Sequence, residues 1–300
     1  MFNIFIRNRF IFLSVFLFSL CNCFAQSHEN LNSFFSPTNR LKFGNYLFLE
    51  KDYLRALNEF REYLKTENND TVRFKFAYCF LKIGRYEEAA ENFKGLFFNS
   101  TLEEEAKLQF FRANFLLSLY NSSDFFSFRD LTEKQIYASE KYALHLNRLK
   151  FISHLFDYSI LPDTNEFFSA FDDSNYTSIK KFYFMKKYPN YKSQTTAGLL
   201  SAFLPGLGKV YTGEFTDGIT AFAATGLLVF LAVNNFNHHH NFRGWLFTGL
   251  SVLTYAGNIY GSVASAQIYN ARVRFNFKNE VKLYFEQRDF LLPKIDFLER

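Results

Sequence analysis

The sequence predicts an all-α protein in which a region of helical repeats is followed by a two-helix transmembrane hairpin. Three observations lead to this fold class: apolar residues recur with a period of 33 residues before residue 100, charged residues become scarce after residue 193, and the N-terminus has the pattern of an export signal. We therefore expect a signal peptide, a helical repeat domain, a membrane hairpin module and an amphipathic tail, at 1–25, 26–190, 191–270 and 271–300.

The composition excludes several classes of protein. Hydrophobic residues make up 48% of the 300 residues and the mean hydropathy is −0.13, values that fit neither a polytopic membrane protein throughout nor a disordered chain. Phe is unusually frequent, with 43 residues. The net charge of +5 is small and the basic residues are spread out, so nucleic acid is not expected as a partner.

Residues 1–25 are typical of a secretory signal peptide. Two arginines precede an apolar run from Phe10 to Leu20, and small residues stand before a cleavage site at Gln26. The run is short for a membrane span, which favours cleavage over an uncleaved anchor. The mature chain would keep Cys79 alone, within an apolar helical pattern, so we predict a buried thiol and no internal disulfide.

Two helical units lie in register before residue 100. Each has a small residue in a first helix, then a turn, and then an aromatic residue, an alanine and a phenylalanine in a second helix. The residues are Gly44, Tyr53, Ala56 and Phe60 in the first unit, and Ala77, Gly84, Tyr86, Ala89 and Phe93 in the second.

These units resemble the tetratricopeptide repeat, a helix–turn–helix of about 34 residues. The family's tryptophan near the start and its closing proline are missing here. The resemblance implies a solenoid whose concave surface binds a peptide or protein segment. Further helices are expected at 103–119, 125–132, 133–158 and 166–171, where they would extend and cap the solenoid, because at least three repeats are normally needed for stability.

Two stretches with few charges predict the membrane hairpin. Asp217–Asn234 and Arg243–Ala266 each carry one charged residue, at the first position, and each approaches the roughly 20 residues that a span needs. A buried hairpin of a soluble protein is the alternative, which the length and adjacency of the stretches disfavour. The shorter apolar stretch Thr195–Leu204 predicts an interfacial or re-entrant helix.

A glycine-rich element joins this short helix to the first predicted span. Its residues are Pro205, Gly206, Gly208, Tyr211, Gly213 and Gly218. Their order resembles the Pro-Gly-x-Gly-x-x-Tyr-x-Gly pattern of two-span membrane modules of the TM2 type, over about residues 194–266. The resemblance implies membrane insertion and leaves any activity open. A phosphate-binding loop is not indicated, because Val210 follows Lys209 where Ser or Thr would be required.

No catalytic residue, metal ligand or cofactor site is predicted. The consecutive residues His238–His240 diverge in direction and have no carboxylate or thiol nearby, which favours a loop between the two spans. The tail after Asn270 fits either a strand or a helix, and we favour an amphipathic helix on the membrane surface.

Two signals conflict on orientation. The signal peptide would place the repeats outside the cytoplasm, whereas Lys and Arg residues gather at 180–192 and 272–282, which the positive-inside rule assigns to the cytoplasm. Because the first hydrophobic segment usually dominates, we expect the repeats in the periplasm and the hairpin in the inner membrane.

These observations predict a membrane-anchored adaptor of the bacterial cell envelope that binds an envelope protein or peptide and membrane lipid. Two alternatives remain. The chain could act through the hairpin in membrane-protein assembly or transport, or it could be a membrane enzyme with a site near the glycine-rich element.

Overall fold

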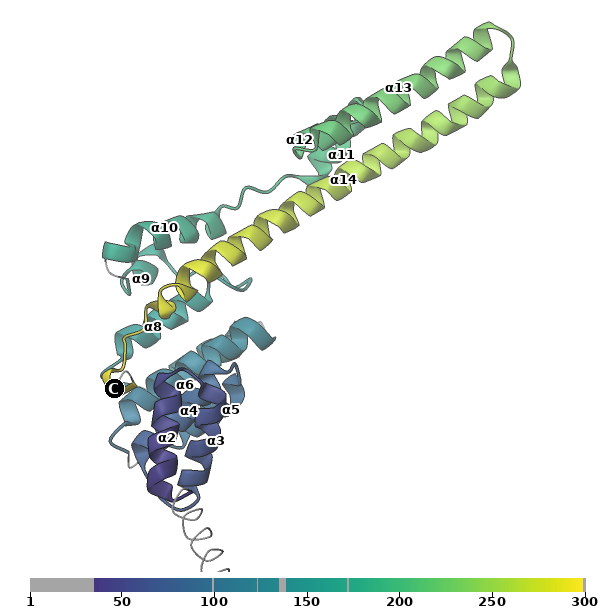
Figure 1. Cartoon of the computed structure of the whole chain (residues 1–300). Coiled ribbons are helices and arrows are strands. Elements are labelled where there is room, and N and C mark those ends of the chain that lie inside the picture. The colour runs from purple at the N-terminus through teal and green to yellow at the C-terminus, as the bar shows by residue number, and fades with distance from the viewer. Residues whose placement is uncertain (1–34, 99, 123, 135–138, 172, 299–300) are drawn as a thin grey trace, which may run out of the picture. The chain divides into compact units, whose positions relative to one another are not determined.

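The computed structural model describes residues 35–298 apart from 99, 123, 135–138 and 172, and every regular element in these ranges is helical (Figure 1). The predicted signal peptide lies outside the described residues. Contacts divide the chain into two compact units, of which the first combines the residues up to Ser159 with Leu291–Arg300 and the second is Ile160–Phe290. The domain boundary that the sequence predicts near residue 190 is based on a change in composition, and it stays a prediction.

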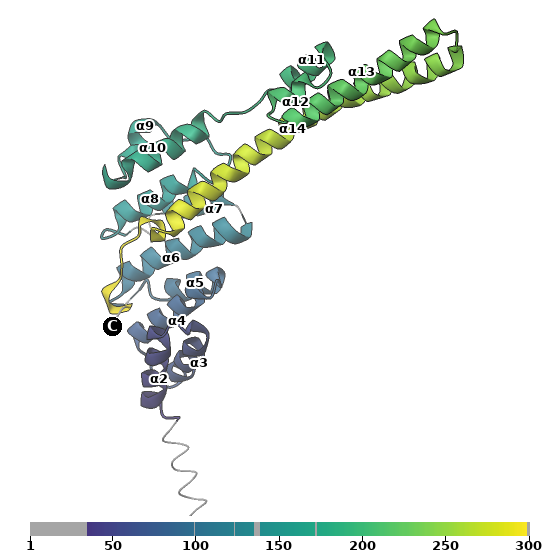
Figure 2. The ribbon, with the colours of Figure 1, turned by 45° about the horizontal axis from the view of Figure 1, so that its top comes forward.

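The first unit begins with helices that each pack against the next in the sequence (Figure 2). These are α2 (Pro37–Leu49), α3 (Tyr53–Leu64), α4 (Asp70–Lys82), α5 (Tyr86–Lys94) and α6 (Glu103–Leu117). Side chains of Ser36, Asp52 and Asn69 accept hydrogen bonds from the first backbone N–H groups of α2, α3 and α4. These caps satisfy donors that a helix start leaves unpaired, so these three helices begin where the sequence supplies a cap, whereas α5 and α6 begin without a side-chain cap.

The following segment departs from the prediction. It contains a π-helical turn η1 (Ser118–Ser122), α7 (Phe125–Glu133) and α8 (Ala143–Ser153). The helix expected over 133–158 is wrong in extent, because Lys134 adopts extended backbone and ends α7, and a new helix begins only at Ala143.

Aromatic side chains form much of the core of the first unit. Phe115 is fully buried and its ring meets Phe125, Phe128 and Phe156 at centroid distances of 5.6, 5.4 and 6.1 Å. Ring pairs at such distances add about 0.5–1.5 kcal/mol each beyond the burial of apolar area. Buried phenylalanines of this core therefore account for part of the high Phe content of the sequence.

The second unit is dominated by two long helices. Its elements are α9 (Thr164–Phe168), α10 (Asp173–Lys187), α11 (Gln194–Phe203), α12 (Leu207–Tyr211), α13 (Phe215–Asn237) and α14 (Asn241–Glu286). The last two pack along each other in opposite directions (Figure 1). The helix α14 has 46 residues and joins the second predicted span to the predicted tail. The tail is therefore helical up to Glu286, as favoured from the sequence, and the strand alternative is wrong over this stretch. Its position on a membrane surface stays a prediction.

Among the described residues, one helix is both long enough and apolar enough to cross a membrane, and this is α13. It contains the first predicted span. The second predicted span lies within α14 and stays a prediction.

Candidate functional site

The repeat residues singled out from the sequence lie at contacts between helices. A Cβ at Gly44 would come within 2.8 Å of the Phe60 ring, so α2 and α3 approach closely at this point. Gly84 has φ +82° and forms the turn between α4 and α5. The five other small and phenylalanine positions are fully buried: Ala56, Phe60, Ala77, Ala89 and Phe93.

The two tyrosines that open second helices both contact a later helical segment. The Tyr53 ring lies 6.4 Å from Tyr78 on α4, and Tyr86 stacks on Tyr120 in η1 at 5.7 Å. Both tyrosines therefore pack on another aromatic ring, and most residues of the repeated pattern serve packing.

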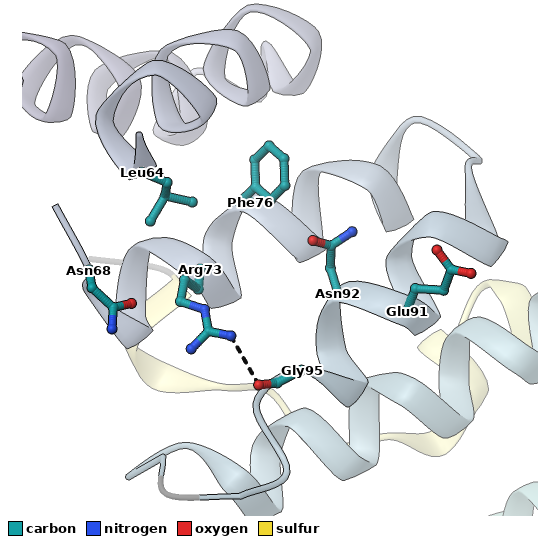
Figure 3. A pocket seen from close by; sticks show the side chains of 7 residues that line it. All are labelled: Leu64, Asn68, Arg73, Phe76, Glu91, Asn92 and Gly95. Carbon is teal, nitrogen blue, oxygen red and sulfur yellow. Dashed lines mark hydrogen bonds between the residues drawn. The ribbon is translucent and has the colours of Figure 1, made fainter. Parts of the chain in front are cut away.

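A small cavity opens among α3, α4 and α5, with a volume of about 260 Å³ (Figure 3). Leu64 and Phe76 give it an apolar side, and Arg73 lies across from them with a guanidinium N–H donated to the carbonyl oxygen of Gly95 at 3.0 Å. Asn68, Glu91 and Asn92 supply polar groups at its edge. This size suits one or two side chains of a bound segment rather than a whole cofactor.

A buried cation and a buried thiol lie next to each other on α4. Lys75 donates to Asn45 Oδ1 at 3.0 Å and lies 5.4 Å above the Phe48 ring, which ties α4 to α2. Burial lowers the pKa of Lys75. Burial also raises the pKa of Cys79 to about 12. Cys79 is therefore a protonated, unreactive thiol at neutral pH, in agreement with the sequence prediction of a buried residue.

A hydrogen-bonded network connects α7 to the end of α8. Arg129 donates to Asp157 at 2.5 Å and to the Ser153 hydroxyl at 3.2 Å. Asp157 accepts further hydrogen bonds from the backbone N–H and the hydroxyl of Ser159, whose oxygen lies 3.0 Å from His154 Nδ1. Ser159 donates its proton to the carboxylate rather than to the imidazole, so this is not the arrangement of a nucleophile and its base.

The glycine-rich element surrounds α12, and three of its glycines stand at close backbone contacts. Gly206 has φ +87°, and a Cβ there would lie 1.9 Å from the carbonyl oxygen of Gly218. A Cβ at Gly208 would lie 2.0 Å from the carbonyl oxygen of Ala197, and one at Gly218 would lie 2.6 Å from Val210 Cγ2. Side chains at these positions would push the backbones apart, so the glycines specify packing.

The other residues of the element have different roles. Gly213 has φ +89° but open space around a Cβ, so only its backbone conformation requires glycine. The Tyr211 hydroxyl accepts the N–H of Ser193 at 3.3 Å, and the Lys192 ammonium lies 4.7 Å above its ring. Pro205 lies in the turn between α11 and α12.

Sequence reasoning missed a set of polar contacts, here named the polar seam, that joins α11, α12 and α14. The hydroxyls of Ser201 and Ser262 share a buried hydrogen bond of 2.6 Å, and Ser201 accepts the N–H of Gly208 at 2.9 Å. Ser265 donates to Glu214 at 2.5 Å. The signal that points to the polar seam is the spacing of serines on one face of an otherwise apolar helix.

Asn258 lies one helical turn before Ser262 and is only 6% exposed. Within the described part of the chain, neither its amide nitrogen nor its amide oxygen has a hydrogen-bond partner. Leaving such a group unpaired costs about 1–3 kcal/mol, which the surrounding helix packing must outweigh.

The distribution of side chains on α13 is the reverse of that in a soluble protein. Its buried residues are the small ones Gly218, Thr225 and Ala232, spaced by seven. Large apolar side chains face outward instead, with Leu227 58% and Phe230 64% exposed. Small residues inside and large apolar residues outside are typical of helices that pack together in lipid.

No group of three or more His, Cys, Asp or Glu side chains that could hold a metal ion occurs in the described ranges. His238–His240 are exposed in the turn between α13 and α14, the place expected from the sequence. Comparisons with protein-family models, with curated proteins and with solved structures find no match.

Proposed function

We propose that this chain is a membrane-anchored helical-repeat adaptor of the bacterial cell envelope, with a tetratricopeptide-like first unit and a second unit that inserts as a hairpin. The observation that carries the proposal is the outward-facing apolar surface of α13. In water this surface would be an apolar patch of a kind that monomeric soluble proteins rarely expose, whereas lipid covers it without cost.

The neighbouring helix supports the hairpin. The first half of α14 also points large apolar side chains outward, including Trp245, Leu253 and Tyr260 at 69%, 70% and 76% exposure. Its buried residues in the same stretch are Gly244, Asn258, Ser262, Ser265 and Ala266, which are small or polar. Two helices with this distribution, joined by a short turn, fit a hairpin in lipid better than either a water-exposed pair or a soluble core.

The binding role rests on the first unit. Its helices bury one face against their neighbours and leave the cavity near Arg73 and Phe76 open to a side chain of another segment. The glycine-rich element supports an enzyme less well, because the atoms nearest to Gly206 and Gly208 are backbone atoms and the side chains of Ser201 and Ser262, which leave no room for a substrate. The partner that fits is an envelope protein or peptide, together with membrane lipid.

We expect the full chain to remain in the membrane pellet after an alkaline wash, and the double variant Leu227→Arg/Phe230→Arg to be released. Each Arg near the centre of a span costs about 2.5–3.5 kcal/mol on insertion scales. The matched control is Phe98→Arg/Phe126→Arg, which changes two exposed aromatic residues of the first unit and should leave the protein in the pellet. Release of the unmodified chain would contradict membrane anchoring.

The orientation has its own test. A reporter enzyme that is active only outside the cytoplasm, inserted after Asn190 between α10 and α11, should be active. The same reporter inserted after His239 should be inactive, because two spans would place that turn in the cytoplasm. Activity at the second position alone would show that the positive-inside rule decides the topology and that the repeats lie in the cytoplasm.

A further inference from the structure

The last residues of the chain pack against the first unit. Leu291–Leu298 belong to that unit by their contacts, and the yellow end of the chain lies beside it in both views (Figures 1 and 2). The Phe297 ring meets the Phe74 ring edge to face at 5.1 Å. Phe74 on α4 is fully buried and contacts Phe93 on α5 at the same distance. The C-terminal segment therefore helps to cover an aromatic cluster of the repeat core.

This segment has the properties of a short peptide ligand. It consists of irregular backbone that ends in a single 3-10 turn, η4 (Asp296–Leu298), and makes no long helix of its own. Its Leu292 and Ile295 are buried, so two aliphatic side chains and one aromatic side chain anchor it. Anchoring by a few apolar side chains at fixed spacing is how grooves of folded domains bind short segments.

The connection to this segment is strained. Asp289, Phe290 and Leu291 have φ values of +48°, +56° and +58°, and they form the turn η3 (Asp289–Leu291). The left-handed conformation costs free energy in residues other than glycine, because the Cβ approaches the following carbonyl oxygen, and runs of such residues are rare. The turn lies where the chain passes from the second unit to the first. Strain in the connection weakens the net docking of the segment.

We propose that Leu292–Leu298 is an intramolecular ligand of the repeats, which must leave before a partner segment with the same pattern of two aliphatic residues and a phenylalanine can bind over Phe74. The inference rests on the proposed adaptor function and adds the chemical class of its partner, a short apolar peptide. It also adds a form of regulation, because the fraction of molecules with the segment released sets the apparent affinity for the partner.

The test measures binding of a fluorescein-labelled synthetic peptide with the sequence of residues 291–298 to the full-length protein in detergent micelles. The variant Phe297→Ala should bind the peptide at least about tenfold more tightly than the unmodified chain, because its own segment has lost the aromatic anchor that the peptide brings. Phe98→Ala, an exposed position, is the matched control and should bind as the unmodified chain does. Equal affinities of Phe297→Ala and the unmodified chain, or no binding to either, would overturn the proposal.

A second variant moves the affinity in the opposite direction. Asp289→Gly changes an exposed residue and relieves one strained position, so the segment should dock more firmly and the peptide should bind about threefold more weakly. If Phe297→Ala does not fold, this variant decides, and an unchanged affinity overturns the proposal. The experiment uses a peptide of this chain in detergent, so its result is independent of membrane retention and topology, on which the adaptor function depends.

Discussion

Gly206→Ala should lower the stability of the second unit by about 3–5 kcal/mol, because a left-handed residue gains a Cβ and that Cβ overlaps a carbonyl oxygen. The overlapping atom is the backbone oxygen of Gly218, 1.9 Å from the new Cβ, and backbone cannot rotate away as a side chain can. Thermal unfolding in detergent would measure the effect through the emission of Trp245, the single tryptophan of the chain, which packs edge to face on Phe236 of α13 at 5.5 Å.

Substitutions at two other glycines distinguish the cost of the positive φ from the cost of the overlap with Gly218. Gly213→Ala shares the positive φ but meets open space, so we expect a loss of only about 1–2 kcal/mol. Gly226→Ala lies inside α13 with nothing within 4 Å of its Cβ and should stabilise the helix by about 1 kcal/mol. Equal losses at Gly206 and Gly213 would show that the contact with Gly218 is unimportant.

Arg129→Met should lower the stability of the first unit by about 3 kcal/mol at pH 7. The substitution keeps an apolar stem but leaves the Asp157 carboxylate, whose side chain is only 17% exposed, without its cation. Removing one partner of a largely buried pair costs about 3–5 kcal/mol, and the remaining hydrogen bonds from Ser159 reduce that loss. Denaturant unfolding followed by circular dichroism measures it. Lys134→Met, which breaks the exposed pair with Asp130, should change stability by less than about 1 kcal/mol.

The same network gives a pH dependence with a defined sign. Burial alone would raise the pKa of Asp157, but hydrogen bonds from Ser159 and Arg129 outweigh it and hold that pKa below its ordinary value. A carboxyl with a lowered pKa in the folded state contributes stability above its unfolded value of about 3.9, and this contribution is lost as the pH falls through the folded pKa. The difference between the unmodified chain and Arg129→Met should therefore shrink below about pH 4. A constant difference down to pH 2 would contradict the role of this ion pair.

The start of each second repeat helix could be predicted because its causes are local. The predicted helix-opening residues Tyr53 and Tyr86 are the first residues of α3 and α5, since the aromatic–alanine–phenylalanine spacing lies on one helical face. The segment 133–158 could not be predicted in the same way. Its apolar residues fit a helix throughout, and only the tertiary structure shows that α8 ends at Ser153, beside the network of Arg129.

The residues of the glycine-rich element could also be named from the sequence, but their partners could not. Ser201 and Ser262 are separated by 61 residues, and neither belongs to the motif. The same holds for Phe74 and Phe297, which are distant from each other in the sequence and meet only in the folded chain. Such contacts depend on the path of the whole backbone, which no local pattern contains.

The sequence by itself determined that the described residues are helical, where the repeat spacing lies, and that the stretch 217–234, now part of α13, is apolar enough to span a membrane. Only the tertiary structure decided which side of α13 faces inward, which glycines lie against backbone, and where the C-terminal segment packs. The physical reason is the range of the interactions. Helix formation depends on hydrogen bonds and side-chain spacing within a few residues, whereas packing joins residues that are distant in sequence, and an apolar helix has the same composition in a soluble core and in lipid.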